Sequence, residues 1–192
     1  MNIELKDGKL ILFCGPSGSG KTTIVHHLLK NNSRLCFSVS ATTRPMRNTE
    51  TDGIDYHFLS VDSFKEKIKQ DEFIEWEEVY HNGFYGTLKS EVEKIWQQNK
   101  VAVFDVDVEG GVKIKKKFGG NLLAVFVKPP SAGDLHKRLH ARETETPESL
   151  KARIAKSEHE LTFANRFDKV LINGDKEKAF KEAQQLVDEF LN

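Results

Sequence analysis

A run of glycines, one lysine and two threonines follows an apolar stretch near the start of the chain: GPSGSGKTT, residues 15–23. Its spacing matches G-x-x-x-x-G-K-[ST] at every fixed position. Glycines let such a loop turn its backbone N–H groups inward around phosphate oxygens, and the helix that follows directs its positive dipole end at the same anion. The run therefore predicts a site for the phosphates of a nucleoside triphosphate.

Two side chains of this run have chemistry of their own. Lys21 supplies a movable positive charge, and the hydroxyl of Thr22 is an oxygen ligand suited to Mg2+. We expect the whole run to surround the triphosphate. Its members are Gly15, Pro16, Ser17, Gly18, Ser19, Gly20, Lys21, Thr22 and Thr23.

A second group of polar residues crowds into ATTRPMR, residues 41–47. Taken alone, Arg44 and Arg47 describe a solvated loop. If the strand before them runs parallel to the first strand, however, they emerge at the same edge of the sheet as the glycine-rich loop. Guanidinium groups stay charged and present paired donors to phosphate oxygens, so the two arginines are candidates to hold a second phosphate. The phenols of Tyr56 and Tyr85 would add neutral donors.

Five further motifs follow the glycine-rich loop in order: SxTTRPxR, DGIDYHF, FIEWEEV, FYGT and VFDVDVEG. Together they resemble guanylate kinase, a family of P-loop nucleoside monophosphate kinases, over residues 15–173. The resemblance implies an enzyme that transfers the γ-phosphate of ATP to GMP or dGMP. It implies that GMP is held by Ser40, Arg44, Arg47, Tyr56, Glu75, Tyr85, Thr87, Asp105 and Asp107.

The chemistry of guanine agrees with the carboxylate among these residues. Guanine presents N1–H and an exocyclic amine side by side, and one carboxylate accepts both, whereas adenine presents an acceptor at N1. We expect Glu75 to read this edge and the hydroxyls of Ser40 and Thr87 to donate to the guanine carbonyl oxygen. The alternative for Glu75 is a solvent-facing strand position, as we expect for Glu77 and Glu78.

Asp105 and Asp107 close an apolar strand, and their alternation points both side chains to the same side. One of them is expected to orient Mg2+ with Thr22, directly or through water, while both contact the guanine side; the alternative is that they only end the strand. A phosphate monoester is largely dianionic near neutral pH, since its second pKa is about 6, so the acceptor oxygen needs no base. Positioning and charge stabilisation carry such a transfer.

The segment KRLHARETET resembles the family's lid, although Glu143 stands where the family usually has glycine. Lid arginines stabilise charge on the transferring group, unless they pair with nearby acids instead. Asn173 matches a position that contacts the adenine of ATP. The resemblance thus implies these catalytic residues: Lys21, Arg44, Arg138, Arg142 and Arg153.

Two other functions share the pattern. Guanylate-kinase-like modules bind phosphopeptides without catalysis, but typically with a degraded glycine-rich loop, and this loop is intact. The third candidate is a kinase for another nucleoside monophosphate. Glu75 and Ser40 argue against it, since they are the residues expected to read guanine. The expected partners are ATP and GMP, with Mg2+, and neither nucleic acid nor membrane; the pattern leaves the oligomeric state open.

The elements that must position these residues follow from the apolar spacing. Apolar runs of strand length recur at residues 10–14, 101–106, 122–127 and 170–172, and a shorter run at 36–39 is a fifth candidate. Helix-like stretches separate them, which predicts a parallel sheet covered by helices. We expect an α/β, three-layer P-loop nucleoside-triphosphate-binding fold: a five-stranded parallel core sheet, a small mixed α/β GMP-binding insertion and a helical lid.

The expected division of the chain follows the same pattern. Residues 40–89 are rich in aromatic, extended pieces around one helical stretch at 62–69, and residues 176–191 have the spacing of a packing helix. The expected parts are core 1–39, GMP-binding insertion 40–89, core 90–130, lid with flanking helices 131–166, and last strand with C-terminal helix 167–192.

Composition limits the remaining possibilities. The 29 Lys and Arg balance 29 Asp and Glu, so no global field attracts nucleic acid or an anionic membrane. The basic run KIKKK at 113–117 is then expected to be a solvated helix face. Cys14 and Cys36 have no partner at metal or redox spacing and are expected to be reduced, buried thiols. Charges stand in MNIELKDGKL where a signal peptide would need an apolar stretch, and no segment approaches the apolar length of a membrane span, which favours a cytoplasmic protein.

Overall fold

The structure is a computed structural model that describes residues 8–140 and 147–192. Its centre is a sheet in the order β2-β7-β1-β8-β9, in which all neighbouring strands are parallel. The strands are β1 (Leu10–Cys14), β2 (Leu35–Phe37), β7 (Val101–Asp105), β8 (Leu122–Lys128) and β9 (Lys169–Ile172). The predicted five-stranded parallel sheet, with its short fifth strand, is confirmed.

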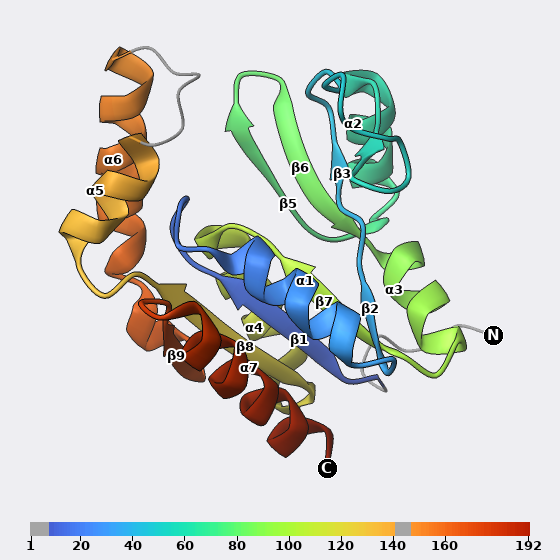
Figure 1. Cartoon of the computed structure of the whole chain (residues 1–192). Coiled ribbons are helices and arrows are strands. Elements are labelled where there is room, and N and C mark those ends of the chain that lie inside the picture. Colours follow the sequence, from blue (N-terminus) through green and yellow to red (C-terminus); the bar gives the residue numbers. More distant parts are fainter. Residues whose placement is uncertain (1–7, 141–146) are drawn as a thin grey trace.

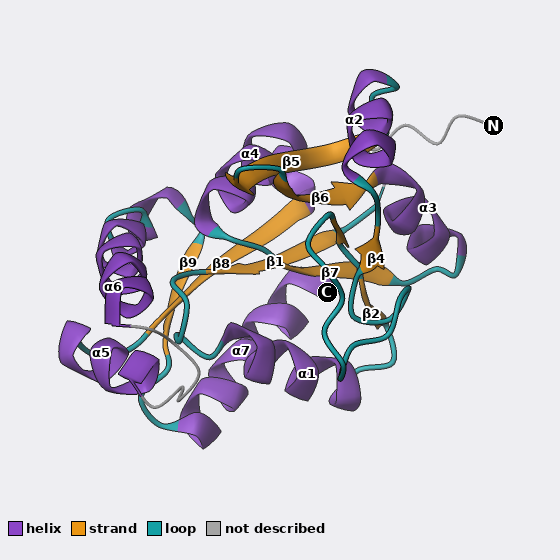
Figure 2. Ribbon diagram, turned by 90° about the horizontal axis from the view of Figure 1, so that it is seen from above, coloured by secondary structure: helices purple, strands orange, loops and turns teal. Residues whose placement is uncertain are grey.

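Helices cover both faces of this sheet and make three layers (Figure 1). Figure 2 shows α1 (Lys21–Asn31) and α7 (Lys176–Leu191) on one face, and α3 (Lys89–Gln97) and α4 (Val108–Phe118) on the other. Strand β1 lies in the middle, and all its residues are fully buried. Burial on both faces explains why β1 and β8 are continuous apolar runs rather than alternating ones.

A second, mixed sheet has the order β4-β3-β6-β5 and lies above one end of the core sheet in Figure 1. Its elements are β3 (Ala41–Thr42), β4 (His57–Phe58), α2 (Val61–Lys69), β5 (Phe73–Tyr80) and β6 (Gly83–Leu88). Phe64 of α2 stacks on Phe73 and Phe84, with ring centroids 4.3 and 5.4 Å apart. This small aromatic core explains why this part of the sequence is rich in aromatic residues.

Two helices of the predicted lid region stand beside the core sheet: α5 (Ala132–His140) and α6 (Pro147–Leu161). A hydrogen-bonding contact joins them, with His136 Nε2 3.0 Å from Glu158 Oε1. Arg142 and Glu143, both named from the lid pattern, lie outside the described residues. No described helix is long and apolar enough to cross a membrane.

The two cysteines differ from each other. Cys14 is fully buried in the central strand, and burial raises the pKa of its thiol well above the ordinary value. Cys36 is only partly buried, because β2 is the edge strand of the core sheet and has one neighbour. The prediction that both thiols are buried is therefore wrong for Cys36.

The basic run of α4 is not simply a solvated face. Lys113, Lys116 and Lys117 are exposed, as expected, but Lys115 donates to the carbonyl oxygen of Arg166 at 2.9 Å and lies 2.8 Å from a carboxylate oxygen of Asp168. Lys113 and Lys117 reach strand β5. The lysines of this helix hold neighbouring segments, which the basic composition alone does not reveal.

Candidate functional site

The glycine-rich loop spans the turn between β1 and α1. Gly15, Gly18 and Gly20 have φ of 140°, 82° and 89°, a backbone region that side chains with a Cβ rarely adopt. Helix α1 begins at Lys21 without a side-chain cap, which leaves its first N–H groups available to an anion. Lys21 Nζ donates to the carbonyl oxygens of Gly15 and Pro16 at 2.9 and 3.3 Å. The loop therefore has the backbone of an anion cradle with its ammonium folded across it.

Thr22 and Asp105 meet beside this loop. The hydroxyl of Thr22 donates to Asp105 Oδ2 at 2.6 Å, since Asp105 ends β7 opposite Phe13 of β1. A hydroxyl and a carboxylate at this distance are oxygen ligands of the kind that Mg2+ prefers when it also binds phosphate oxygens and water. These donors fit the ion, although the described residues contain no group of three or more His, Cys, Asp or Glu side chains arranged for a metal.

Asp107 has a different neighbourhood. Its Oδ1 accepts a hydrogen bond from Gly110 N at 2.8 Å and caps the start of α4. Both aspartates still line the same cavity, as the sequence predicts. The hydrogen bonds assign the loop-facing position to Asp105 and the helix-capping position to Asp107, which alternation along the strand does not distinguish.

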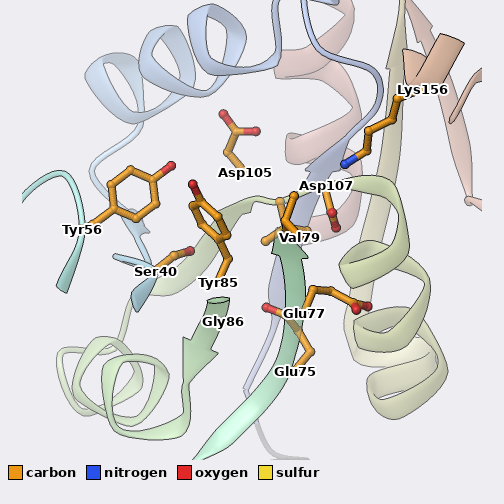
Figure 3. A pocket seen from close by; sticks show the side chains of 11 residues that line it. Ser40, Tyr56, Glu75, Glu77, Val79, Tyr85, Gly86, Asp105, Asp107 and Lys156 are labelled. Atoms are coloured by element: carbon orange, nitrogen blue, oxygen red, sulfur yellow. The ribbon is translucent and has the colours of Figure 1, made fainter. Parts of the chain in front are cut away.

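A cavity of about 260 Å³ opens between the second sheet and the carboxyl end of β7 (Figure 3). Six residues named from the sequence line it: Ser40, Tyr56, Glu75, Tyr85, Asp105 and Asp107. Glu77 and Lys156 also line it and were not predicted. Glu77 was expected to face solvent, but its side chain is only 21% exposed and pairs with Lys113 of α4, whereas Glu78 is exposed as expected.

Glu75 is the buried carboxylate of this cavity, with 8% exposure. It lies opposite Thr87 in the β5–β6 ladder, and the Thr87 hydroxyl donates to its Oε1 at 2.7 Å. Burial raises the pKa of Glu75 to about 7, helped by the negative charges of Asp107 and Glu77 and opposed by the Thr87 hydrogen bond. Thr87 is fully buried behind this carboxylate, and its hydroxyl holds Glu75.

Arg44 has a carboxylate partner that the sequence reading missed. Its Nη1 and Nη2 donate to the two carboxylate oxygens of Glu50 at 2.6 and 2.5 Å, and its guanidinium carbon lies 4.9 Å from the centre of the Tyr56 ring. The hydrogen bond from Arg44, together with one from Arg47 N, lowers the pKa of Glu50 to about 2. The Arg47 residue itself is exposed. Glu50 thus fixes one arginine side chain and the loop that carries the other.

Tyr56 and Tyr85 stand together on the side of the cavity near this loop (Figure 3). Their rings meet edge to face, with centroids 6.1 Å apart. Burial raises the pKa of Tyr56, so its phenol keeps its proton and remains a hydrogen-bond donor.

Arg138 and Asn173 converge on the glycine-rich loop from α5 and from the end of β9. Asn173 Nδ2 donates to the carbonyl oxygen of Ser19 at 2.8 Å, and Arg138 donates to the same oxygen at 3.3 Å. Arg138 also donates to the carbonyl oxygen of Asn173 at 2.7 Å. Both predicted residues therefore lie at the loop, where they bind its backbone.

A second cavity, of about 600 Å³, adjoins the first and lies over the glycine-rich loop. Arg153, predicted from the lid pattern, lines it together with Gly15, Lys21 and Thr22. Glu160 of α6 also lines it and is buried, which raises its pKa. The two cavities share part of their walls: Tyr56, Asp105, Val106, Asp107 and Lys156. A ligand in one cavity would therefore face a ligand in the other across the two aspartates.

Comparisons of the sequence and of the structure with known proteins point to the same family. A family model described as guanylate kinase matches residues 7–190. The chain is 49% identical over 191 residues to a guanylate kinase of Bacteroides thetaiotaomicron, a match that covers 100% of this chain and 94% of that protein. It is 42% identical to a guanylate kinase of Porphyromonas gingivalis, covering 95% of this chain and 98% of that one. The crystal structure of guanylate kinase from Anaplasma phagocytophilum superposes with a TM-score of 0.75 at 25% identity, covering 96% and 87% of the two chains.

Proposed function

Since the chain belongs to the guanylate kinase family, we propose that it transfers the γ-phosphate of ATP to GMP in the two adjoining cavities, giving ADP and GDP. As a member of this family it is a nucleotide-binding transferase. The observation that carries the assignment of sites is the buried carboxylate of Glu75, in a cavity whose wall is shared with the cavity over the glycine-rich loop.

Guanine enters the cavity beside Glu75. The ionised carboxylate accepts N1–H and the exocyclic amine together, and Ser40 contributes a hydroxyl to the base. Thr87 acts on Glu75, because its hydroxyl donates to the carboxylate and limits the directions in which it can point. A buried acceptor matched to one base rejects another base strongly, since the mismatch leaves polar groups unpaired.

The phosphate of GMP lies toward Arg44, Arg47 and the two tyrosines. Arg44 is held by Glu50 and by the Tyr56 ring before any ligand arrives, which lowers the entropy lost on binding. The phenols add donors without charge. The acceptor phosphate then faces the aspartates and Lys156 at the shared wall.

The triphosphate of ATP occupies the glycine-rich loop. Its backbone N–H groups bind phosphate oxygens, and Lys21 exchanges its carbonyl partners for the β- and γ-phosphates. Thr22 and Asp105 would hold Mg2+, which when bound supplies positive charge to the phosphate oxygens. Arg153 faces the same space and adds charge stabilisation, with Arg142 as the further candidate named from the lid pattern.

The proposal extends to the organisation of the chain. Residues 40–89 form the GMP-binding part and residues 131–166 the lid, joined to core parts at 1–39, 90–130 and 167–192. A cytoplasmic location accords with the two free cysteines.

A coupled assay for ADP release tests the function with GMP, AMP, UMP and dTMP as acceptors. We expect turnover with GMP and a rate at least about a hundredfold lower with the other three. Transfer to AMP but not GMP would contradict the base assignment. Binding of GMP without any ADP release would favour a non-catalytic phosphopeptide-binding module instead.

Binding of GMP is expected to strengthen as the pH rises through about 7. The pKa of Glu75 is about 7, so its carboxyl is protonated below that pH and accepts both guanine donors only above it. The dissociation constant, measured by calorimetry, should fall about tenfold from pH 6 to pH 8. Because the GMP phosphate titrates near pH 6, the matched control is Glu75→Gln, which should retain only the smaller phosphate effect. Identical profiles for both proteins would exclude Glu75 as the titrating group.

Removing the charge of Glu50 is expected to loosen the arginines. Glu50→Gln leaves Arg44 with a neutral partner, so GMP binding must order this side chain; the Michaelis constant for GMP should rise about fivefold with little change in kcat. Steady-state kinetics measures both, and Glu66→Gln, on the exposed part of α2, is the control. A lower Michaelis constant would mean that Glu50 competes with the phosphate.

A further inference from the structure

One side of α4 is directed at strand β5. Gly110, Lys113 and Lys117 lie three and four residues apart, which places them on the same side of the helix. Each of them meets Glu75 or a residue beside it in the strand. We refer to these three residues as the α4 face.

The two lysines bind the strand on both sides of the guanine-facing carboxylate. Lys113 Nζ lies 2.6 Å from Glu77 Oε1 and donates to the carbonyl oxygen of Trp76 at 3.3 Å. Lys117 Nζ donates to the carbonyl oxygen of Ile74 at 3.4 Å. Strand β5 is at the edge of its sheet, so the two ammonium groups bind it from the side that has no neighbouring strand.

Gly110 provides the space into which the carboxylate fits. A Cβ at this position would lie 3.0 Å from Glu75 Oε2 and 3.1 Å from Asp107 Oδ1, closer than such contacts normally come. The first turn of α4 therefore approaches Glu75 without a side chain between them. The Thr87 hydroxyl holds the other oxygen, so the carboxylate is confined from two directions.

Lys113 also controls the charge of the cavity wall. Glu77 lines the cavity on the same face of β5 as Glu75, two residues along. The Lys113 ammonium neutralises Glu77 and draws it toward α4. Without that ammonium a second carboxylate, unpaired, would repel Glu75 and compete for the donors of the base.

We propose that the α4 face, and Lys113 above all, positions Glu75 and so sets the preference of the enzyme for guanine. This inference rests on the proposed function and adds positioning residues to it, since Lys113 and Lys117 act through β5. The alternative is that the lysines only cover an exposed strand edge. In that case their loss would affect all acceptor nucleotides alike.

Comparison of GMP with IMP separates the two explanations, because IMP keeps N1–H but lacks the exocyclic amine. In Lys113→Met the ratio of kcat/KM for GMP over IMP should fall about tenfold, with the Michaelis constant for ATP unchanged. Lys113→Arg should restore at least half of the wild-type ratio. The matched control is Lys116→Met, an exposed lysine of the same helix outside the α4 face, which should keep the wild-type ratio.

Gly110→Ala tests the same proposal directly at Glu75, because its Cβ would crowd Glu75 Oε2 and Asp107 Oδ1. The ratio should again fall about tenfold, and the melting temperature shows that the variant is still folded. A wild-type ratio in either variant overturns the proposal, as does an equal loss for GMP and IMP. Dissociation constants of both nucleotides without ATP give the ratio independently of turnover. Failure of the wild type to phosphorylate GMP would therefore reject the proposed function, while the binding ratio still decides the role of the α4 face.

Discussion

Replacing Lys21 by methionine is expected to lower kcat for phosphate transfer about a thousandfold. In the structure the ammonium lies over the glycine-rich loop and donates to the carbonyl oxygens of Gly15 and Pro16. These are weak neutral partners that a triphosphate readily replaces. Methionine has similar length and no charge, so the transferring phosphate loses a cation while the loop keeps its backbone.

Steady-state kinetics at saturating ATP and GMP measures this loss. The dissociation constant of GMP should remain within about twofold of the wild type, because the proposed GMP cavity is lined by other residues. Lys30→Met, in the exposed last turn of α1, is the matched control and should keep full activity. Loss of GMP affinity together with kcat would indicate that the substitution disturbs the fold instead.

Glu75→Gln is expected to lower kcat/KM for GMP about a thousandfold and to leave the Michaelis constant for ATP within about twofold. Glutamine offers one acceptor oxygen, and its amide donors face the donors of guanine. Thr87 can still donate to the amide oxygen, so the cavity keeps its internal hydrogen bond. Equal losses for GMP and ATP would contradict the proposed role, and Glu78→Gln, exposed on the same strand, should behave as wild type.

The same substitution should not weaken the fold. Burial raises the pKa of Glu75 from 4.5 to about 7, so the carboxyl favours the folded state only while it is protonated. The contribution of the protonated carboxyl to the free energy of unfolding is complete below pH 4.5. It is lost as the pH rises through about 7, which lowers the free energy of unfolding by an amount on the order of 3 kcal/mol. The melting temperature of Glu75→Gln relative to wild type should therefore rise between pH 5 and pH 8. A fall over this range would mean that the charge of Glu75 stabilises the protein.

Local patterns predict most of the fold. The strand at 10–14 is apolar throughout because it lies between two layers of helices, and the glycine-rich loop follows it directly. The helix at 176–191 has its predicted bounds, with Ala179 and Ala183 buried against the sheet. Such features depend on neighbours in the sequence, which is why composition and spacing find them.

Contacts between segments that are distant in the sequence cannot be predicted from such local patterns. The partner of Thr87 follows from the register of β5 on β6, and Glu77 is drawn from solvent by a lysine that is 36 residues later in the sequence. Glu50 had one signal, because it is the first acid after two arginines in a polar loop. Lys156 had none, because its place depends on where α6 stands relative to the two cavities.

Because the thiol of Cys14 is fully buried, its reactivity reports when the central strand β1 opens. A neutral thiol without solvent contact is inert to alkylating reagents, so it reacts only when the middle of the sheet opens. In a Cys36→Ser background, the rate of labelling would follow that opening, and a nucleotide held at the adjacent loop would slow it in proportion to its affinity.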